Sequence, residues 1–372
     1  MAKEKKEKEI SGMGKASKLM EKILKNSTIE RACRIEESQI YDPIVPVKTR
    51  VPMLNLALSG KLLDGGITPG IIQFCGPSKS FKSSFSLELV ASYLEADPEN
   101  CAILFDNELG TRPAYFQAFG VDTSRLIWIP FQDIEELSFE LTKQLDGLEE
   151  GDKVIFCVDS LGQAASKRER TNLEEESGKM DLSRPRSIKA LFRVITPKIC
   201  LKQVPAIFVN HTYGSIGGYI SVDVIGGGQG SILASNSIFI IGKQKLKEGD
   251  SHVGYKFALK VFKSRDIKDN AVIPINVTWD GGINKWSGLA LLAESFKIIE
   301  KVKEGRSPAY QYETLSGNII KVLEKDIDID DEFWETVFKE TDLAFKIESS
   351  YKVGSQSNID SAIELEEPEE KK

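Results

Sequence analysis

The stretch from Gly70 to Val90 constrains the fold of this 372-residue chain more than any other. An apolar run of strand length, Ile71–Cys75, leads into a loop of Gly, Pro and Ser, and then into a helical pattern. In such a loop, backbone N–H groups and a helix N-terminus surround phosphates, a Lys reaches the β and γ phosphates, and a Ser hydroxyl binds Mg²⁺. Lys82 and Ser83 fit these two roles. The pattern predicts a nucleotide site built from Gly76, Pro77, Ser78, Lys79, Ser80, Phe81, Lys82, Ser83 and Ser84.

Phe81 departs from the usual phosphate-loop pattern, which has a second Gly before the Lys. Glycine at this place lets the backbone lie directly against the nucleotide. Two interpretations stay open at this point. Either the backbone tolerates a Cβ there, or the stretch is an ordinary strand, loop and helix.

Composition excludes several classes of protein. An apolar fraction of 41% is ample for a buried core. The five cysteines form no CxxC pair, which argues against a disulfide framework or a zinc site. No apolar stretch approaches the roughly 20 residues of a membrane span, so we expect a cytoplasmic protein without membrane contact. The net charge of −7 does not by itself indicate a nucleic-acid partner, although acid concentrates at the end of the chain and basic residues cluster in the middle.

From residue 54 to about 285, short apolar runs alternate with helical patterns. This alternation predicts an α/β fold with a mostly parallel central sheet flanked by helices. Ligands of such sheets bind beyond the carboxyl ends of the strands. The expected strands are Ile71–Cys75, Cys101–Asp106, Leu126–Ile129, Lys153–Asp159, Ala206–Asn210, Ser237–Gly242, Tyr255–Lys263 and Ala271–Trp279.

Three of these strands end in polar residues that suit nucleotide chemistry. Asp159 is the candidate Mg²⁺-supporting acid, with the cap of a turn as the alternative. Glu108 follows the strand that ends at Asp106, where a carboxylate could deprotonate an attacking water; it could equally be a solvated loop acid. His211 could reach a γ-phosphate, or its ring could simply hydrogen-bond a loop.

Two segments have no periodicity, so we expect them to be long loops. Residues 162–186 are rich in charge, and residues 212–231 are rich in glycine. Loops of this length are usually functional or disordered. Their place beside the candidate nucleotide site favours a ligand that is held in only one nucleotide state, with a solvated charge run as the alternative for the first loop. The residues of interest are Lys167, Arg168, Arg170, Lys179, Arg184, Arg186, Gly226, Gly227 and Gly228.

The remaining segments divide the chain. Residues 1–43 contain a weakly amphipathic helix candidate, Lys15–Asn26, which would pack on its own core or on a neighbouring subunit. Ile44–Met53 reads as an extended linker or edge strand before a core at 44–288. Residues 289–354 form a small C-terminal domain, with a helix over Leu289–Lys301, a hairpin over Tyr310–Leu323 and a helix-rich stretch over Asp326–Ile347. The acidic residues 355–372 should be disordered.

Taken in order, these segments resemble the RecA-type DNA strand-exchange recombinases, and among them the UvsX-like recombinases of T-even-type phages. The resemblance spans roughly residues 45 to 285. The UvsX-like proteins share the Phe before the phosphate-loop Lys, so Phe81 favours the match. The other matching segments are Phe105–Gly110 with Pro113–Tyr115, Val158–Gly162, Asn210–Tyr213, Gly226–Gly228 and Lys263–Arg265.

The resemblance implies roles for several residues. Lys82 and Ser83 would bind phosphates and Mg²⁺ with Asp159, and Glu108 would activate water. Tyr115 would lie against the adenine, near Arg112, where bacterial relatives carry an acid. His211 replaces the Gln that senses the γ-phosphate in bacterial relatives. Lys263 and Arg265 would reach ATP in the adjacent subunit.

The resemblance also implies the partners. ATP and Mg²⁺ would be the cofactors, and the two loops would bind single-stranded and double-stranded DNA. Copies of the chain would form a helical filament served by a single-strand-binding protein and a mediator, in the host cytoplasm if the chain is phage-encoded. Two other readings stay open: a RecA-fold ATPase of another type, such as a ring helicase or signalling ATPase, or a non-catalytic paralogue.

Overall fold

The computed structural model describes the chain in two compact units, residues 1–44 and 45–372, which are taken separately. Within the described part, no helix is both long and apolar enough to cross a membrane. The predicted acidic tail lies outside the described residues. Those residues are 15–38, 40, 44–110, 112–149, 151–175, 183–214, 223–248, 251–305 and 307–353.

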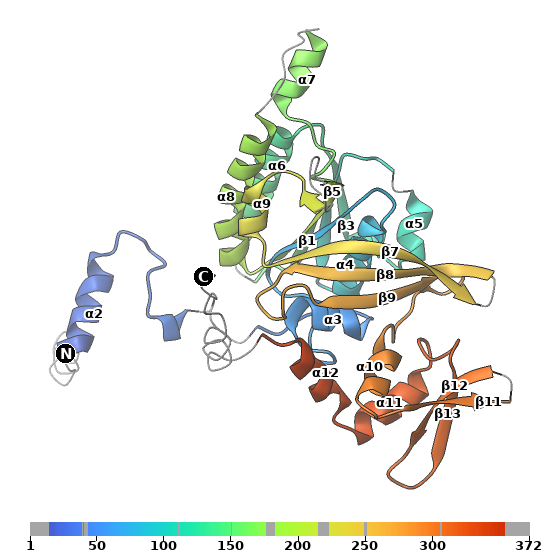
Figure 1. Cartoon of the computed structure of the whole chain (residues 1–372). Coiled ribbons are helices and arrows are strands. Elements are labelled where there is room, and N and C mark those ends of the chain that lie inside the picture. The colour runs from blue at the N-terminus through green and yellow to red at the C-terminus, as the bar shows by residue number, and fades with distance from the viewer. Residues whose placement is uncertain are drawn as a thin grey trace, which may run out of the picture. The chain divides into compact units, whose positions relative to one another are not determined.

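The larger unit is built on one large sheet, and the fold class predicted from the sequence is confirmed (Figure 1). Among the described residues, ten strands join in the order β10-β9-β8-β7-β1-β5-β4-β2-β3, with β6 paired to β5. The strands from β7 to β3 run parallel to one another, and β8, β9 and β10 continue the sheet in antiparallel fashion. The strands are β1 (Gly70–Gly76), β2 (Cys101–Asp106), β3 (Leu126–Pro130), β4 (Val154–Asp159), β5 (Pro205–Gly214), β6 (Asp223–Ile225), β7 (Ser237–Glu248), β8 (Ser251–Lys263), β9 (Val272–Thr278) and β10 (Gly282–Ile283).

Helices cover both faces of the parallel strands. Alternate residues of β1 show the two faces, because Ile72 and Phe74 pack with α4 (Lys82–Ala96), whereas Ile71 belongs to the cluster of α6 (Ile134–Gly147) and α8 (Arg184–Lys202). This alternation is the period of two that a strand imposes. The apolar runs are continuous because both faces are buried.

Other helices connect or flank these layers. The segment predicted as extended at 44–53 is extended only as far as Val51, because Pro52 begins a helix, and Val47 pairs with Ile67. Pro at a first helical position costs no backbone hydrogen bond. The other α-helices before residue 285 in the described part of this unit are α3 (Pro52–Ser59), α5 (Pro113–Ala118), α7 (Lys167–Glu174) and α9 (Gln229–Ala234).

The expectation that residues 162–186 and 212–231 lack structure is wrong in part. Helix α7 occupies part of the first segment, and α8 begins at Arg184. A capping box between Ser166 and Glu169 starts α7, which has no buried residue and so no apolar period to reveal it. In the second segment, β5 runs on to Gly214 and pairs with β6.

The C-terminal part of this unit packs on the sheet rather than apart from it. Trp286, Trp334 and Tyr310 belong to the same apolar cluster as Phe257 of β8. The predicted hairpin is confirmed within a three-stranded sheet of β11 (Glu300–Glu304), β12 (Ser307–Glu313) and β13 (Ile319–Leu323). The helix predicted over 289–301 is too long, because α10 (Leu289–Ser295) ends before β11. Helices α11 (Asp331–Glu340) and α12 (Leu343–Tyr351) follow.

The smaller unit contains the predicted helix. Helix α2 spans Lys15–Asn26, as the sequence indicates, and Leu19, Met20 and Ile23 on it are exposed. A short 3-10 helix follows at Ile35–Glu37. Whether α2 docks on a neighbouring subunit stays a prediction, as does the domain boundary at residue 288.

Candidate nucleotide-binding site

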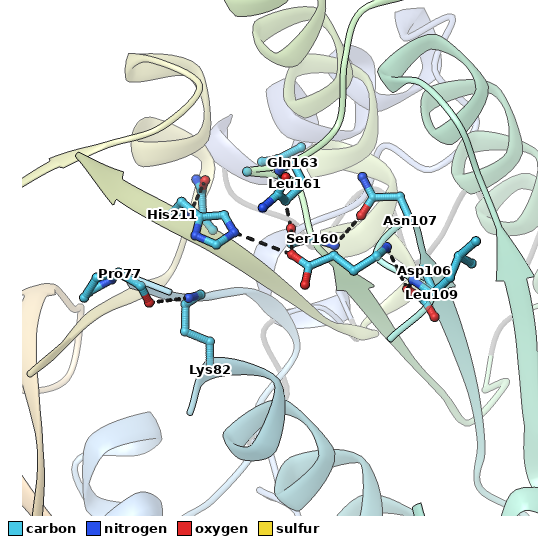
Figure 2. A network of polar contacts seen from close by, with 12 residues as sticks. Pro77, Lys82, Asp106, Asn107, Leu109, Ser160, Leu161, Gln163 and His211 are labelled. Carbon is cyan, nitrogen blue, oxygen red and sulfur yellow. Dashed lines mark hydrogen bonds and ion pairs between the residues drawn. The ribbon is translucent and has the colours of Figure 1, made fainter. Parts of the chain in front are cut away.

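The phosphate loop, residues 76–83, joins β1 to α4 at the carboxyl edge of the sheet. A Cβ on Gly76 would lie 2.7 Å from Ser80 Oγ, so the loop closes tightly where the strand ends. The first turn of α4 places Lys82 under the loop, where its Nζ donates a hydrogen bond to the Pro77 carbonyl at 2.8 Å (Figure 2). The loop therefore has the curvature and the helix N-terminus that bind phosphates.

Lys82 is buried, with 6% of its surface exposed. Burial lowers the pKa of its ammonium, while the negative charges of Glu108 and Asp159 act in the opposite direction. The ammonium and the two carboxylates thus share one small site, although they come from three separate segments. A buried cation with acidic neighbours is suited to an anionic ligand that also carries a metal ion.

Asp159 ends β4 and has the features of a metal-supporting acid. Its Oδ1 is buried without a hydrogen-bond partner in the described structure. The Ser83 hydroxyl bonds to its side chain, and burial raises its pKa to about 6, with Glu108 and Asp106 adding to the rise. Carboxylate and hydroxyl oxygens are ligands that Mg²⁺ accepts. Asp159 and Ser83 therefore fit a Mg²⁺ ion held between the loop and β4.

Glu108 lies beyond β2 and is held by contacts with Ser160 and His211, two residues that are labelled in Figure 2. Ser160 Oγ donates to Glu108 Oε1 at 2.7 Å, and His211 Nε2 lies 3.5 Å from the same oxygen. His211 lowers the pKa of Glu108 most, and Ser160 acts in the same direction against burial, which raises it. Glu108 is therefore ionised at neutral pH and can accept a proton from water.

Sequence reasoning missed the residues that hold the Glu108 turn. Asp106 Oδ1 accepts from the backbone N–H groups of Glu108 and Leu109, at 3.0 and 2.9 Å. Asn107 Oδ1 accepts from the Ser160 N–H at 2.7 Å and so joins the ends of β2 and β4. The signal was available, because Asp106 and Asn107 stand at a strand end, but the partner of Asn107 lies 53 residues away in the sequence.

His211 links the site to the glycine-rich segment. Its carbonyl accepts from the Gly226 N–H at 2.9 Å, and Asn210 Nδ2 donates to the Gly226 carbonyl at 2.9 Å. On its other side, Gly162 lies so close that a Cβ there would be 2.3 Å from His211 Cδ2. Gly162, which follows β4, and Gly226, which follows β6, therefore both lie against His211.

The structure favours the first of the two interpretations of Phe81. The backbone at Phe81 is left-handed, with φ 70°, the conformation that normally favours glycine. The ring stacks on Phe257 with centroids 4.9 Å apart and meets Phe85 edge-on at 5.5 Å. Aromatic packing of this kind offsets the unfavourable backbone angle, which costs roughly 1–2 kcal/mol for a residue with a Cβ.

Tyr115 lies beside the first turn of α4, and Arg112 is the residue before α5. The Tyr115 hydroxyl hydrogen-bonds with Ser84 Oγ, and its ring meets Phe119 edge-on at 5.2 Å. Arg112 precedes α5 and has extended backbone. With 38% of its surface exposed, Tyr115 offers a ring next to the phosphate loop. A contact of either residue with a base stays a prediction.

Lys263 ends β8 at the end of the sheet that lies away from the phosphate loop, and Arg265 follows it along the chain. Lys263 pairs with Ile238 near the start of β7, whereas the phosphate loop follows the end of the parallel strand β1. Lys263 Nζ donates to the carbonyls of Ile232 and Leu233 at 2.8 and 3.0 Å. The resemblance implies that both cations reach ATP in an adjacent copy of the chain. Their distance from the phosphate loop of their own chain agrees with that prediction, which stays untested.

The basic residues of the first predicted loop have different surroundings. Lys167 and Arg168 are exposed on α7, and Arg186 is exposed at the start of α8. Arg170 is paired with Asp133 at 3.0 Å. Arg184 donates to the carbonyls of Leu161, Gly162 and Ala164, so it holds the turn after β4. Lys179 lies outside the described residues, and DNA contacts of all these side chains stay predictions.

The glycines of the second segment serve close packing. Gly227 and Gly228 have φ of 87° and 75°, in the left-handed region. A Cβ on Gly227 would lie 2.9 Å from Ile188 Cδ1, so this turn lies against α8. A Cβ on Gly226 would lie 3.1–3.3 Å from atoms of Tyr213, Asn210 and His211. These glycines join the segment to β5 and α8, whatever ligand it binds.

Comparison with known proteins agrees with this geometry. The family model described as the RecA N-terminal domain matches residues 16–284. The "Recombination and repair protein" of Enterobacteria phage T4 is 36% identical over 343 residues, covering 91% of this chain and 87% of that protein. "Protein RecA" of Corynebacterium glutamicum (strain R) is 26% identical over 327 residues, covering 86% and 83%. "Protein RecA" of Bifidobacterium breve is 27% identical over 255 residues, covering 68% and 63%. The chain belongs to the RecA family.

Proposed function

We propose that this chain is an ATP-dependent DNA recombinase that forms a filament on single-stranded DNA and pairs it with homologous duplex. The observation that carries the proposal is the meeting of Lys82, Asp159, Glu108 and His211 at one edge of the sheet, where β4 and β5 continue into the two loop segments. Family membership and the T4 relative, which is named for recombination and repair, support the same function.

Different residues of the site carry out different parts of ATP hydrolysis. Lys82 and the loop N–H groups bind the phosphates, and Ser83 and Asp159 hold Mg²⁺, whose charge offsets that of the phosphates. Glu108 orients a water molecule and accepts its proton, while Ser160 keeps the carboxylate in place. Lys263 and Arg265 reach the ATP of an adjacent copy, so that each site is complete only in the filament.

Nucleotide state reaches DNA through His211. Its ring contacts Glu108, and its carbonyl holds Gly226 at the start of the glycine-rich turn. A γ-phosphate near the ring fixes both, and its loss releases them, which changes the order of the DNA-binding segments. While the γ-phosphate is bound, Lys167, Arg168 and Arg186 hold DNA phosphates and the bases stay free to pair.

The test of this function is joint-molecule formation between single-stranded DNA and homologous duplex with ATP and Mg²⁺. We expect joint molecules with the wild-type chain and none with Lys82→Ala, together with filaments on single strands. Filaments without joint molecules contradict the strand-exchange activity. Duplex unwinding without joint molecules would instead identify a helicase, and DNA binding without ATP turnover would identify a non-catalytic paralogue.

A further inference from the structure

Two residues of the phosphate loop have backbone angles that favour glycine. Lys79 and Phe81 have φ of 61° and 70°. Residues with a Cβ disfavour the left-handed region, so such angles persist only where the surroundings fix them. The loop itself contains no glycine between Gly76 and Ser83 to take up this conformation. The restraint must come from outside the loop.

Both left-handed residues contact the same pair of strands, β7 and β8. These two strands form an antiparallel ribbon (Figure 1). Lys243 Nζ of β7 donates a hydrogen bond to the Lys79 carbonyl at 3.2 Å. The Phe257 ring of β8 stacks on Phe81 with centroids 4.9 Å apart and planes 20° apart. Lys243 and Phe257 lie directly opposite each other in the ladder. One cross-strand pair therefore holds both residues.

The pair is itself fixed by its neighbours. Lys243 Nζ lies 3.6 Å from the centroid of the Tyr255 ring, a cation–π contact that restrains the ammonium. Phe257 is 1% exposed and meets Phe85 of α4 edge-on at 5.7 Å. The buried Phe257 thus has little freedom to follow a moving loop, and the contact with Tyr255 restrains the exposed Lys243.

We infer that Lys243 and Phe257 are positioning residues that set the phosphate-binding shape of the loop and replace the glycine that Phe81 displaces. This inference rests on the proposed ATP site and adds that nucleotide affinity depends on two side chains of the neighbouring ribbon. Neither side chain acts on the reacting atoms. Their effect therefore falls on nucleotide binding before the chemical step.

The test is the Kd of the wild-type and variant chains for mant-ATP with Mg²⁺, in the absence of DNA. We expect Phe257→Leu to raise Kd about tenfold, since the left-handed backbone loses its aromatic support. The matched control is Phe239→Leu, because Phe239 is buried in β7 but stacks on Phe74 instead of the loop. The control should bind as wild type, and thermal melting shows that both variants are folded.

A double-mutant comparison separates positioning from general packing. Phe81→Gly restores a residue that adopts the left-handed angle without support. In that background, adding Phe257→Leu should change Kd by no more than about twofold relative to Phe81→Gly alone, because Phe257 no longer has a loop ring to support. An equal rise in Kd in both backgrounds, or no rise in either, overturns the inference.

Lys243 gives an independent arm that does not disturb the core. Lys243→Met should raise Kd, and Lys243→Arg should restore most of the affinity because it keeps a donor for the Lys79 carbonyl. Lys260→Met removes an exposed charge elsewhere on β8 and should have no effect. Equal affinity of Lys243→Met and Lys260→Met overturns this arm. A wild-type chain that binds no nucleotide contradicts the proposed function itself.

Discussion

Nε2 of His211 lies 3.5 Å from Oε1 of Glu108, although His211 is part of β5, Glu108 follows β2, and β4 separates these two strands in the sheet. The contact joins the proposed base to the strand that carries the glycine-rich segment. A change at a bound γ-phosphate would therefore alter the proposed base and the glycine-rich segment together.

Replacing the proposed base should stop chemistry without stopping binding. We expect Glu108→Gln to lower the rate of ATP hydrolysis by about 10²–10⁴-fold, since the amide cannot accept a proton from water. Affinity for mant-ATP should stay near wild type. Glu99→Gln alters a surface acid paired with Lys153 and serves as the control. Hydrolysis by Glu108→Gln at the wild-type rate would exclude Glu108 as the base.

Ser160 should matter through Glu108. Its buried hydroxyl donates to the carboxylate at 2.7 Å, so Ser160→Ala leaves Glu108 free to rotate. We expect kcat to fall about tenfold with KM for ATP little changed, as for a lost hydrogen bond to a charged group. Ser138→Ala removes a hydroxyl from α6, where it bonds only to the Ile134 carbonyl. A rise in KM alone would place Ser160 in nucleotide binding instead.

The close approach of Gly162 to His211 predicts a sensitive glycine. A Cβ at residue 162 would lie 2.8 Å from the His211 backbone N, so Gly162→Ala should displace His211 and destabilise the fold by about 1–3 kcal/mol. Hydrolysis should fall as well. Gly147→Ala is the matched control, because no described residue lies within 4 Å of a Cβ added there. Equal denaturation midpoints for the two variants would show that β5 does not approach Gly162 this closely.

Asp159 should make ligand-free stability depend on pH. Burial raises its pKa to about 6 from the ordinary value of 3.8, so the fold prefers the protonated form. Its contribution to stability is present below pH 3.8 and is lost as the pH rises through about 6. Asp159→Asn should therefore raise the melting temperature at pH 7 but not at pH 4. The reverse order at pH 7 would contradict this account.

The same group should control the metal. Mg²⁺ binds the ionised carboxylate, so Mg²⁺-dependent affinity for mant-ATP should rise as the pH passes through about 6. In Asp159→Asn this dependence should disappear, because the amide does not titrate. An unchanged pH profile in that variant would assign the titration to another group.

The parallel core could be predicted because its strands are buried on both faces and read as apolar runs. Strands with polar faces were predicted too short: β7 continues through Lys243, Lys245 and Lys247 to Glu248, well past the apolar run that ends at Gly242. Helix α7 was missed because it buries no residue, so its sequence has no apolar period. Pattern reasoning finds elements by what they bury.

The site was predictable residue by residue, but its connections were not. Lys82, Glu108, Asp159 and His211 each stand at a strand end or a helix start, which the sequence shows. The support of Phe81 by Phe257 depends on two segments far apart in the chain that meet only in the folded sheet. No local pattern encodes such a contact, so the sequence alone shows Phe81 only as a departure from the phosphate-loop motif.

The central claim, that one ATP site governs a DNA-binding recombinase, is tested most directly by ATP hydrolysis with and without single-stranded DNA, with Lys82→Ala as the blank. We predict strong stimulation by single-stranded DNA in the wild-type chain and none in the variant. Turnover that is equal with and without DNA would contradict the claim and point to an ATPase of another kind.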